Sequence, residues 1–218
     1  MRSPIAREGL PIIGGFVAGT AVLFRVWRPL GWLGAGLTAW AVWFFRDPDR
    51  TAPAGEGLVV SPADGLVLPL VTASPPAELG MGGEPRTRIS VFMDVFDVHV
   101  NRTPIDGEVV ALAYRPGRFF NAAFDKASDH NERMSIRLRP RSTGGGEAED
   151  FAVVQIAGLV ARRIKCDLVE SQQVERGSRF GIIRFGSRLD VYLPPGVTPA
   201  VQPGERVTAG ESVIARWT

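Results

Sequence analysis

The sequence contains a single cysteine, Cys166, and only two histidines among its 218 residues. One thiol cannot form an intramolecular disulfide, which excludes a secreted domain held together by internal disulfides and favours a reducing compartment. A structural or catalytic metal centre usually needs several Cys or His ligands. We therefore predict neither disulfides nor a bound metal.

Lysine is also scarce, since only Lys126 and Lys165 stand among the 25 basic residues. The 23 acidic residues nearly balance them and leave a net charge of +2. Nucleic-acid binding needs a concentrated basic stripe, which this composition does not provide, so we predict no nucleic-acid partner. A lipoyl or biotinyl carrier needs a modifiable lysine at a hairpin tip, and neither lysine has that setting.

The N-terminal part lacks one long uninterrupted apolar run and has two shorter ones instead, at residues 10–24 and 30–45. Each run would form about 22 Å of helix, less than the roughly 30 Å of a bilayer core. Arg25 and Arg28 separate the runs and resist crossing a membrane. We predict that residues 1–46 form an apolar helical hairpin that anchors the chain in a membrane, in a re-entrant or in-plane position rather than as two spans.

Arginines at both ends of this hairpin favour the cytoplasmic side of the cell membrane for both ends. Tryptophans favour the membrane interface over a soluble core, although a pair of buried helices stays an alternative. A signal peptide is disfavoured because the second run follows the first too closely. These residues are Arg2, Arg7, Arg46 and Arg50, and Trp27, Trp32, Trp40 and Trp43.

After residue 46, charges and turn residues become regular, and short apolar runs alternate with Gly and Pro. Such runs are typical of strands, and residues 118–133 fit a loop with some helix. The paired turns at residues 201–211 resemble those of lipoyl and biotinyl domains. We therefore predict that residues 47–218 form a mostly β, barrel-sandwich-like domain. The expected strands are 57–60, 66–71, 88–93, 108–113, 134–138, 151–156, 181–185 and 189–193.

The pair Gly186-Ser187 lies between two of these runs, which we expect to be adjacent strands. In a constrained turn a serine hydroxyl can attack the preceding carbonyl, and glycine has no side chain to obstruct it. The resulting ester can break by β-elimination to dehydroalanine, which hydrolyses to a pyruvoyl group and ammonia. The pair alone is weak evidence, because Gly177-Ser178 offers the same chemistry and both fit ordinary hairpin turns.

Five segments in order supply the context that selects Gly186-Ser187. Together they resemble the phosphatidylserine decarboxylase family in its short form, over residues 45–193. They are Phe45-Arg46-Asp47-Pro48, Ser61-Pro62-Ala63-Asp64-Gly65, residues 92–104 with Asp97-Val98-His99, Asn131-Glu132-Arg133, and Phe185-Gly186-Ser187.

The resemblance implies self-cleavage after Gly186 into residues 1–186 and a small chain, residues 187–218, that begins with the pyruvoyl group made from Ser187. It also implies that Asp64 and His99 assist Ser187 in a Ser/His/Asp-like arrangement. A histidine can take a proton near neutral pH, and a carboxylate can stabilise its charged form. By themselves, Asp64-Gly65 fits a turn and His99 a strand residue.

One position departs from the longer bacterial form of the family, in which a second histidine follows three positions after the first. Arg102 stands there in this sequence. The second histidine is credited with self-cleavage and the first with decarboxylation. His99 must therefore serve both steps, or another group such as His130 replaces one of them.

The implied reaction is decarboxylation of phosphatidylserine to phosphatidylethanolamine and carbon dioxide, through a Schiff base between the lipid amine and the covalent pyruvoyl cofactor. The implied partners are the bilayer lipid, the membrane and the cleaved small chain, and a homo-oligomer stays open. Candidates for contact with the lipid phosphate are Arg46, Arg115, Arg118 and Arg133.

Two other functions compete with this one. A membrane-anchored adaptor with an uncleaved barrel-sandwich domain explains the hairpin and the β pattern, but leaves the order of Asp64, His99 and Gly186-Ser187 to coincidence. A pyruvoyl decarboxylase of a soluble amino acid explains those residues, but leaves the hairpin without a role.

Overall fold

A computed structural model gives the structure of the chain for residues 4–117, 131–141, 149–158, 164–184 and 186–217. The chain divides into two compact units, Met1–Asp49 and Arg50–Thr218. Each unit is described by itself below.

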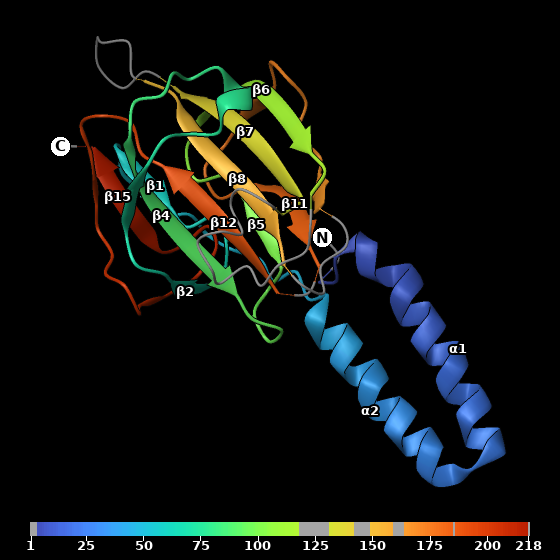
Figure 1. Cartoon of the computed structure of the whole chain (residues 1–218). Coiled ribbons are helices and arrows are strands. Elements are labelled where there is room, and N and C mark those ends of the chain that lie inside the picture. The colour runs from blue at the N-terminus through green and yellow to red at the C-terminus, as the bar shows by residue number, and fades with distance from the viewer. Residues whose placement is uncertain (1–3, 118–130, 142–148, 159–163, 185, 218) are drawn as a thin grey trace. The chain divides into compact units, whose positions relative to one another are not determined.

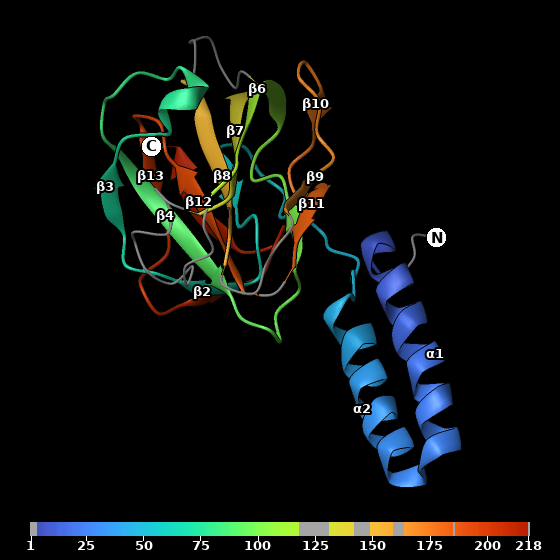
Figure 2. The ribbon, with the colours of Figure 1, turned by 45° about the vertical axis from the view of Figure 1, so that its right-hand side comes forward.

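The first unit is a pair of helices that lie side by side (Figures 1 and 2). A short 3-10 helix, Arg7–Gly9, leads into α1, Leu10–Val26, and α2 spans Arg28–Phe44. Trp27 separates the helices because its backbone is extended. Small residues allow the two helices to approach closely. A Cβ on Gly31 of α2 would overlap the Phe24 ring of α1. The hydroxyls of Thr20 and Thr38, one on each helix, are 2.9 Å apart.

The predicted helical hairpin is confirmed, but its helices are longer than the apolar runs. Each has 17 residues, and the helical stretch Arg7–Val26 reaches 20 residues, or about 30 Å at the usual rise. By length and composition this stretch could cross a membrane, a test that core helices of soluble proteins and signal sequences also pass. The difference arises because Arg25 continues the helix instead of ending it.

The second unit is built of short strands (Figure 1). Their predominance confirms the predicted mostly β fold. They are β1 Leu58–Val60, β2 Gly65–Val67, β3 Val71–Ala73, β4 Arg86–Met93, β5 Val100–Arg102, β6 Gly107–Arg115, β7 Arg133–Pro140, β8 Phe151–Ala157, β9 Ile164–Cys166, β10 Gln173–Val174, β11 Arg179–Ile183, β12 Ser187–Tyr192, β13 Val197–Pro199, β14 Arg206–Val207 and β15 Val213–Trp217, with a 3-10 helix, η2, at Ala77–Leu79.

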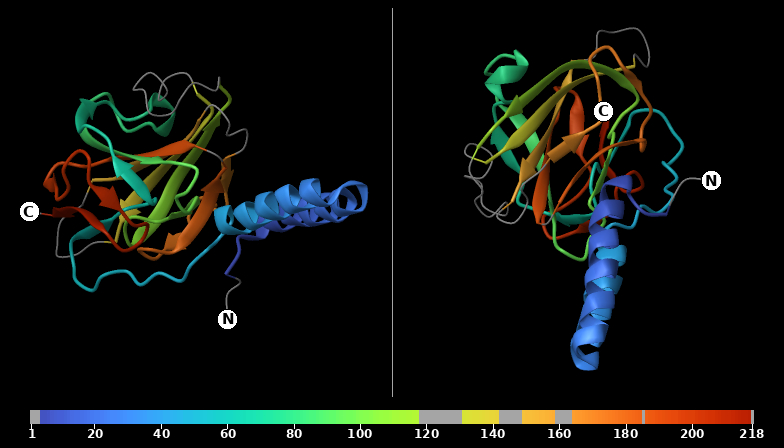
Figure 3. Two further views of the ribbon diagram at one scale, coloured as in Figure 1. Left: turned by 90° about the horizontal axis from the view of Figure 1, so that it is seen from below. Right: turned by 90° about the vertical axis from the view of Figure 1, so that its right-hand side faces the viewer.

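Within the described ranges these strands form three sheets, which Figure 3 shows from two sides. The large sheet has the order β10-β6-β7-β8-β12-β4-β2-β14, and β3 also pairs with β4. The two small sheets have the orders β1-β15-β13 and β5-β11-β9. Every pairing among the described strands is antiparallel. As in any β-strand, alternate residues face opposite sides of the sheet.

The main core covers one face of the large sheet and takes its side chains from all three sheets. Met93, Leu189 and Ile183 come from β4, β12 and β11 and are almost completely buried there. The opposite face is covered near η2, where Leu79 packs with Val154 and Ile156. Strand β8 is therefore buried on both faces, which explains its nearly continuous apolar run.

One expectation about the strands was wrong. The strands on either side of Gly186 are not adjacent, because β11 pairs with β5 and β9, whereas β12 pairs with β4 and β8. Alternating hydrophobicity identifies a strand but not its partners, and a short connection between strands suggested a hairpin. The described chain instead passes from one sheet to another at Gly186.

Candidate active site

Two of the candidate positions, Ser187 and Gly65 beside Asp64, lie at one end of the large sheet, where its register aligns five strands. Ser187 begins β12 and lies opposite Met93 of β4 and Ala157 of β8. Gly65 of β2 lies opposite Val207 and one step beyond the Leu66–Phe92 pair, so it comes next to Met93. In Figure 1 the arrowhead of β4 and the start of β12 are accordingly at the same end. The register thus brings Ser187 and the neighbour of Asp64 into one row.

The backbone conformation at position 186 favours glycine. Gly186 has φ +60°, a left-handed value that other residues adopt only with strain, and a Cβ at this position would meet nothing within 4 Å. The following Ser187 is fully buried, and its hydroxyl lies 3.9 Å from the Met93 sulfur. A constrained glycine therefore precedes a buried serine whose neighbourhood contains a weak sulfur acceptor.

The competing pair Gly177-Ser178 has a different environment. Its carbonyl, Gly177 O, accepts a hydrogen bond from Arg102 at 3.0 Å. The Ser178 hydroxyl is 2.9 Å from that of Thr103, whose backbone N–H donates to Ser178 O. Both groups are committed to a folded turn, in agreement with the turn interpretation of this pair.

His99 is fully buried just before β5. Its Nδ1 lies 3.0 Å from the carbonyl oxygen of Asp97, which can only accept, so Nδ1 carries the proton in this contact. In the neutral ring the lone pair then belongs to Nε2, which is the atom suited to act as a base. His99 O also accepts a hydrogen bond from Ile183 N at 3.3 Å, close to the crossover that contains Gly186.

Two buried polar contacts near Ser187 were missed by the sequence interpretation. Asn101 Nδ2 lies 3.7 Å from the same Met93 sulfur that faces Ser187, and Gln155 Nε2 donates to Asn101 Oδ1 at 2.8 Å. Asn101 is two residues beyond His99, a spacing that puts both side chains on one face of an extended chain. The available signal was Gln155, a polar residue inside the apolar run of β8.

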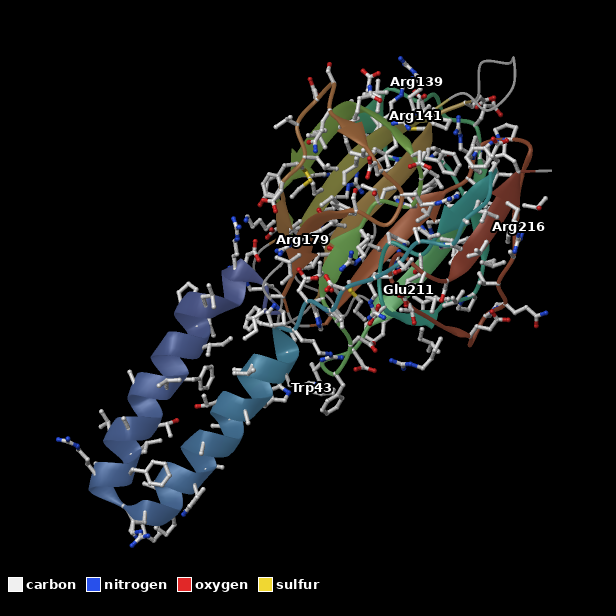
Figure 4. The ribbon with its side chains drawn as sticks, turned by 180° about the vertical axis from the view of Figure 1, so that it is seen from behind. Trp43, Arg139, Arg141, Arg179, Glu211 and Arg216 are labelled. Atoms are coloured by element: carbon white, nitrogen blue, oxygen red, sulfur yellow. The ribbon has the colours of Figure 1, made fainter. Side chains whose placement is uncertain are left out.

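Asp64 ends the bend at residues 62–64 and directly precedes β2. Its Oδ1 accepts a hydrogen bond from Ala209 N at 2.7 Å, and its Oδ2 pairs with Arg50 at 3.0 Å. Arg50 also pairs at 3.2 Å with Glu211, which Figure 4 labels. The side chain of Asp64 is mostly buried, so these contacts fix its orientation. Gly65 must be glycine, because its φ is +145° and a Cβ there would overlap Phe92 O.

Arg102, at the position of the expected second histidine, is buried and supports the turn described above. It also packs on Gly210, where a Cβ would come within 2.9 Å of Arg102 Cδ. These contacts describe a structural side chain. The other candidate for that role, His130, lies outside the described residues.

The arginines suggested for phosphate binding have separate environments. Arg115 and Arg133 line a polar cavity of about 180 Å³ together with Asp190 and Tyr192. Arg133 is held by two hydrogen bonds to Glu78, at 2.7 and 2.8 Å, whereas Arg115 has no ion-pair partner in the described part of the chain. Arg46, in the helical unit, lies 4.3 Å from the Trp43 ring centroid, and Arg118 is outside the described residues.

No group of three or more His, Cys, Asp and Glu side chains in the described ranges is arranged to hold a metal ion.

Comparison with known proteins gives consistent matches over nearly the whole chain. Residues 37–215 match the family described as phosphatidylserine decarboxylase. Phosphatidylserine decarboxylase proenzyme of Paramagnetospirillum magneticum is 58% identical over 212 residues, which cover 97% of this chain and 86% of that protein. Proteins with the same name from Cereibacter sphaeroides and Ruegeria pomeroyi are 57% and 55% identical, over 99% and 97% of this chain and 90% and 94% of their own.

Proposed function

The chain belongs to the phosphatidylserine decarboxylase family, and from this premise we propose that it converts phosphatidylserine to phosphatidylethanolamine and carbon dioxide, after cutting itself between Gly186 and Ser187. The relatives are named proenzymes, which fits a chain that is processed before it acts. The residues proposed for both steps are Ser187, His99 and Asp64.

The observation that carries the proposal is the junction itself. Gly186 has a left-handed backbone, and Ser187 is fully buried at the start of a strand paired on both sides. A buried hydroxyl held beside its own preceding peptide is close to the atom it must attack, which lowers the entropic cost of the reaction. The pair Gly177-Ser178, with its carbonyl and hydroxyl both engaged, lacks this arrangement.

In the proposed cleavage, Ser187 Oγ forms a bond to the carbonyl carbon of Gly186 while His99 takes the hydroxyl proton. The C–N bond then breaks, the nitrogen receives a proton, and an ester links Gly186 to the Ser187 oxygen. Loss of the Ser187 α-proton expels the Gly186 carboxylate and leaves dehydroalanine. Addition of water and loss of ammonia complete the conversion to a pyruvoyl group.

Contacts of the chain support these roles. The bond from His99 Nδ1 to Asp97 O leaves Nε2 as the basic atom. Arg50 and Ala209 N fix the orientation of Asp64 beside Gly65, and the role proposed for this carboxylate is to stabilise the charged imidazole. The pyruvoyl group would supply a ketone that captures the substrate amine and withdraws the electron pair left by departing carbon dioxide. Ser187 is the residue that would hold it, at a chain start kept in place by β4 and β8.

The first unit supports a membrane location. It exposes many large apolar side chains, among them Trp27, Trp32 and Trp43, and α1 buries none of its residues. Such a surface is typical of a helix pair in contact with lipid. We propose that residues 1–46 anchor the enzyme on the cytoplasmic side of the cell membrane, and residues 47–218 form its catalytic domain. A homo-oligomer stays an open proposal.

Intact-mass measurement of the purified chain tests the cleavage. We expect one fragment ending at Gly186 and a second, residues 187–218, with a blocked N-terminus. Ser187→Ala should remain one chain and release no carbon dioxide from phosphatidylserine, whereas the control Ser178→Ala should be cut normally. A chain that stays whole on long incubation, or a Ser187→Ala variant that still decarboxylates, would overturn the proposal.

The same assay separates the two competing functions. An adaptor would remain uncut and inactive. A decarboxylase of a soluble amino acid would release carbon dioxide from free serine in preference to the phospholipid.

A further inference from the structure

The turn that joins β4 to β5 is closed by its own hydrogen bonds. Asp94 Oδ1 accepts from Phe96 N at 2.7 Å, and Asp97 N donates to Asp94 O at 3.2 Å. In return, Asp94 N donates to Asp97 Oδ2 at 2.9 Å. The Asp94 carboxylate thus binds the backbone of Phe96 and the Asp97 carboxylate binds the backbone of Asp94, so Val95 and Phe96 are held in a fixed turn.

The carboxylates of both aspartates lie close to one arginine at the base of the turn. Arg206 of β14 binds Asp97 Oδ1 and lies 3.6 Å from Asp94 Oδ2. The Asp97 carboxylate, followed by Asp94, raises the pKa of Arg206, as expected for a cation between two acids. One cation therefore offsets much of the negative charge that the turn would otherwise present.

The tip of the turn is apolar and exposed. Phe96 is 65% exposed and Val95 39%. A turn usually carries polar residues at its tip, and a phenylalanine gains free energy when it leaves water. The hydrogen bonds fix the backbone of the turn, and the Phe96 side chain that it carries is mostly exposed.

The turn also lies at the end of the sheet that contains Ser187. Asp94 directly follows Met93, the residue opposite Ser187, so Val95 and Phe96 are two and three residues beyond that row. Figures 1 and 2 both show the loop after β4 projecting past the end of the sheet. The exposed apolar tip and the candidate reaction centre therefore share one end of the domain.

We propose that this turn, residues 94–97, inserts Val95 and Phe96 into the lipid surface and so sets the Ser187 end of the sheet against the bilayer. The inference rests on the proposed function, because the substrate of that function is a bilayer lipid that must reach a buried group. An apolar tip on a rigid base enters the interfacial region at little cost in conformational entropy. Arg206 reduces the repulsion that two aspartates would feel from an anionic lipid surface.

Quenching of a fluorophore by labelled lipids tests directly whether the turn enters the lipid surface. In full-length, processed protein with Cys166→Ser, a cysteine placed by Phe96→Cys is labelled with a fluorophore, and vesicles of phosphatidylcholine and phosphatidylserine carry a quencher near the headgroups. The matched control is Val169→Cys, 63% exposed on a loop that bonds to Val109, at the end of β6 remote from Ser187. We expect quenching at position 96 and little at 169. Equal quenching, or none at 96, overturns the inference.

The ratio of the decarboxylation rates on two forms of the substrate provides a second test. For Phe96→Ser, the rate on phosphatidylserine in vesicles divided by the rate on dispersed short-chain phosphatidylserine should fall by about fivefold or more, as loss of one interfacial aromatic implies. Val169→Ser should keep the wild-type ratio, and an equal ratio in both variants contradicts the inference. If wild-type protein decarboxylates neither substrate, the proposed function fails, while the quenching result still decides whether the turn meets lipid.

Discussion

Arg188 and Asp190, two residues apart on the same face of β12, form a two-point ion pair at 2.7 and 2.8 Å that is almost wholly buried. Arg88 Nε lies 3.7 Å from the same carboxylate. The pair lies behind Ser187, on the opposite face of the strand. Burial makes each charge dependent on the other, because neither can return to water in the folded state.

Removal of the Asp190 charge should therefore be costly. Asp190→Asn leaves Arg188 buried without a full counter-charge and should lower the free energy of unfolding by about 3–5 kcal/mol. Urea unfolding in detergent, in a Ser187→Ala background so that the chain stays whole, measures this loss. Asp167→Asn is the control, because Asp167 pairs with Lys165 at 3.0 Å on the surface and should cost about 1 kcal/mol or less. Equal losses would refute the buried-pair argument.

Gly186→Ala should slow self-cleavage without preventing folding. The new methyl group meets nothing within 4 Å, but the left-handed backbone costs about 1–2 kcal/mol for a residue other than glycine. Relaxation of φ would move the Gly186 carbonyl relative to the Ser187 hydroxyl. Gly196→Ala has a matched environment, with φ +78° and no atom within 4 Å, so it should lose similar stability. The time course of self-cleavage should be slower for Gly186→Ala than for Gly196→Ala. A normal cleavage rate for Gly186→Ala would show that the left-handed backbone is not needed.

The small chain should stay attached after cleavage. Strand β12 keeps six paired positions with β4 and six with β8, and its Leu189 and Val191 are fully buried. Because this attachment is mainly hydrogen bonding and apolar burial, salt should not release it. We expect both fragments to co-elute in gel filtration in detergent at low and high salt, and to separate only in guanidinium chloride. Loss of residues 187–218 at high salt would contradict this.

The sequence predicted the fold class well, because the second unit has short apolar runs bounded by Gly and Pro and the two helices are almost entirely apolar. It failed at the partners of β11 and β12, since a short connection does not reveal that the chain changes sheets. At the candidate site, the motif order singled out Ser187, His99 and Asp64, and the register places Ser187 and Gly65 in one row. The contacts of Arg50, Asn101 and Arg206 could not be predicted, because each joins segments distant in sequence.

Glu78 should give stability that depends on acid pH. Burial raises the pKa of its carboxyl, but hydrogen bonds from Arg133 and Ser135 and the Arg133 charge outweigh burial, so the pKa lies below its ordinary 4.5. The folded state therefore favours the ionised form. Its stabilising contribution is complete above pH 4.5 and is lost as pH falls through the lowered pKa.

Thermal unfolding against pH measures this effect. Glu78→Gln should lower the midpoint near neutral pH, and the difference from wild type should shrink as pH falls below 4.5. Glu84→Gln is a suitable control, because Glu84 is exposed and has no ion pair in the described part of the chain. A difference that stays constant across the acid range would contradict the assignment.

The connection from β11 to β12 at Gly186 joins strands of two different sheets, so a cut there need not unfold the protein. A cut inside a hairpin would free two strands that stabilise each other locally, whereas here the strands on either side already belong to different hydrogen-bonded partners. Cleavage of this connection removes one covalent link and none of the hydrogen bonds between paired strands. The molecule could thus mature into a two-chain form while every sheet keeps its full complement of strands.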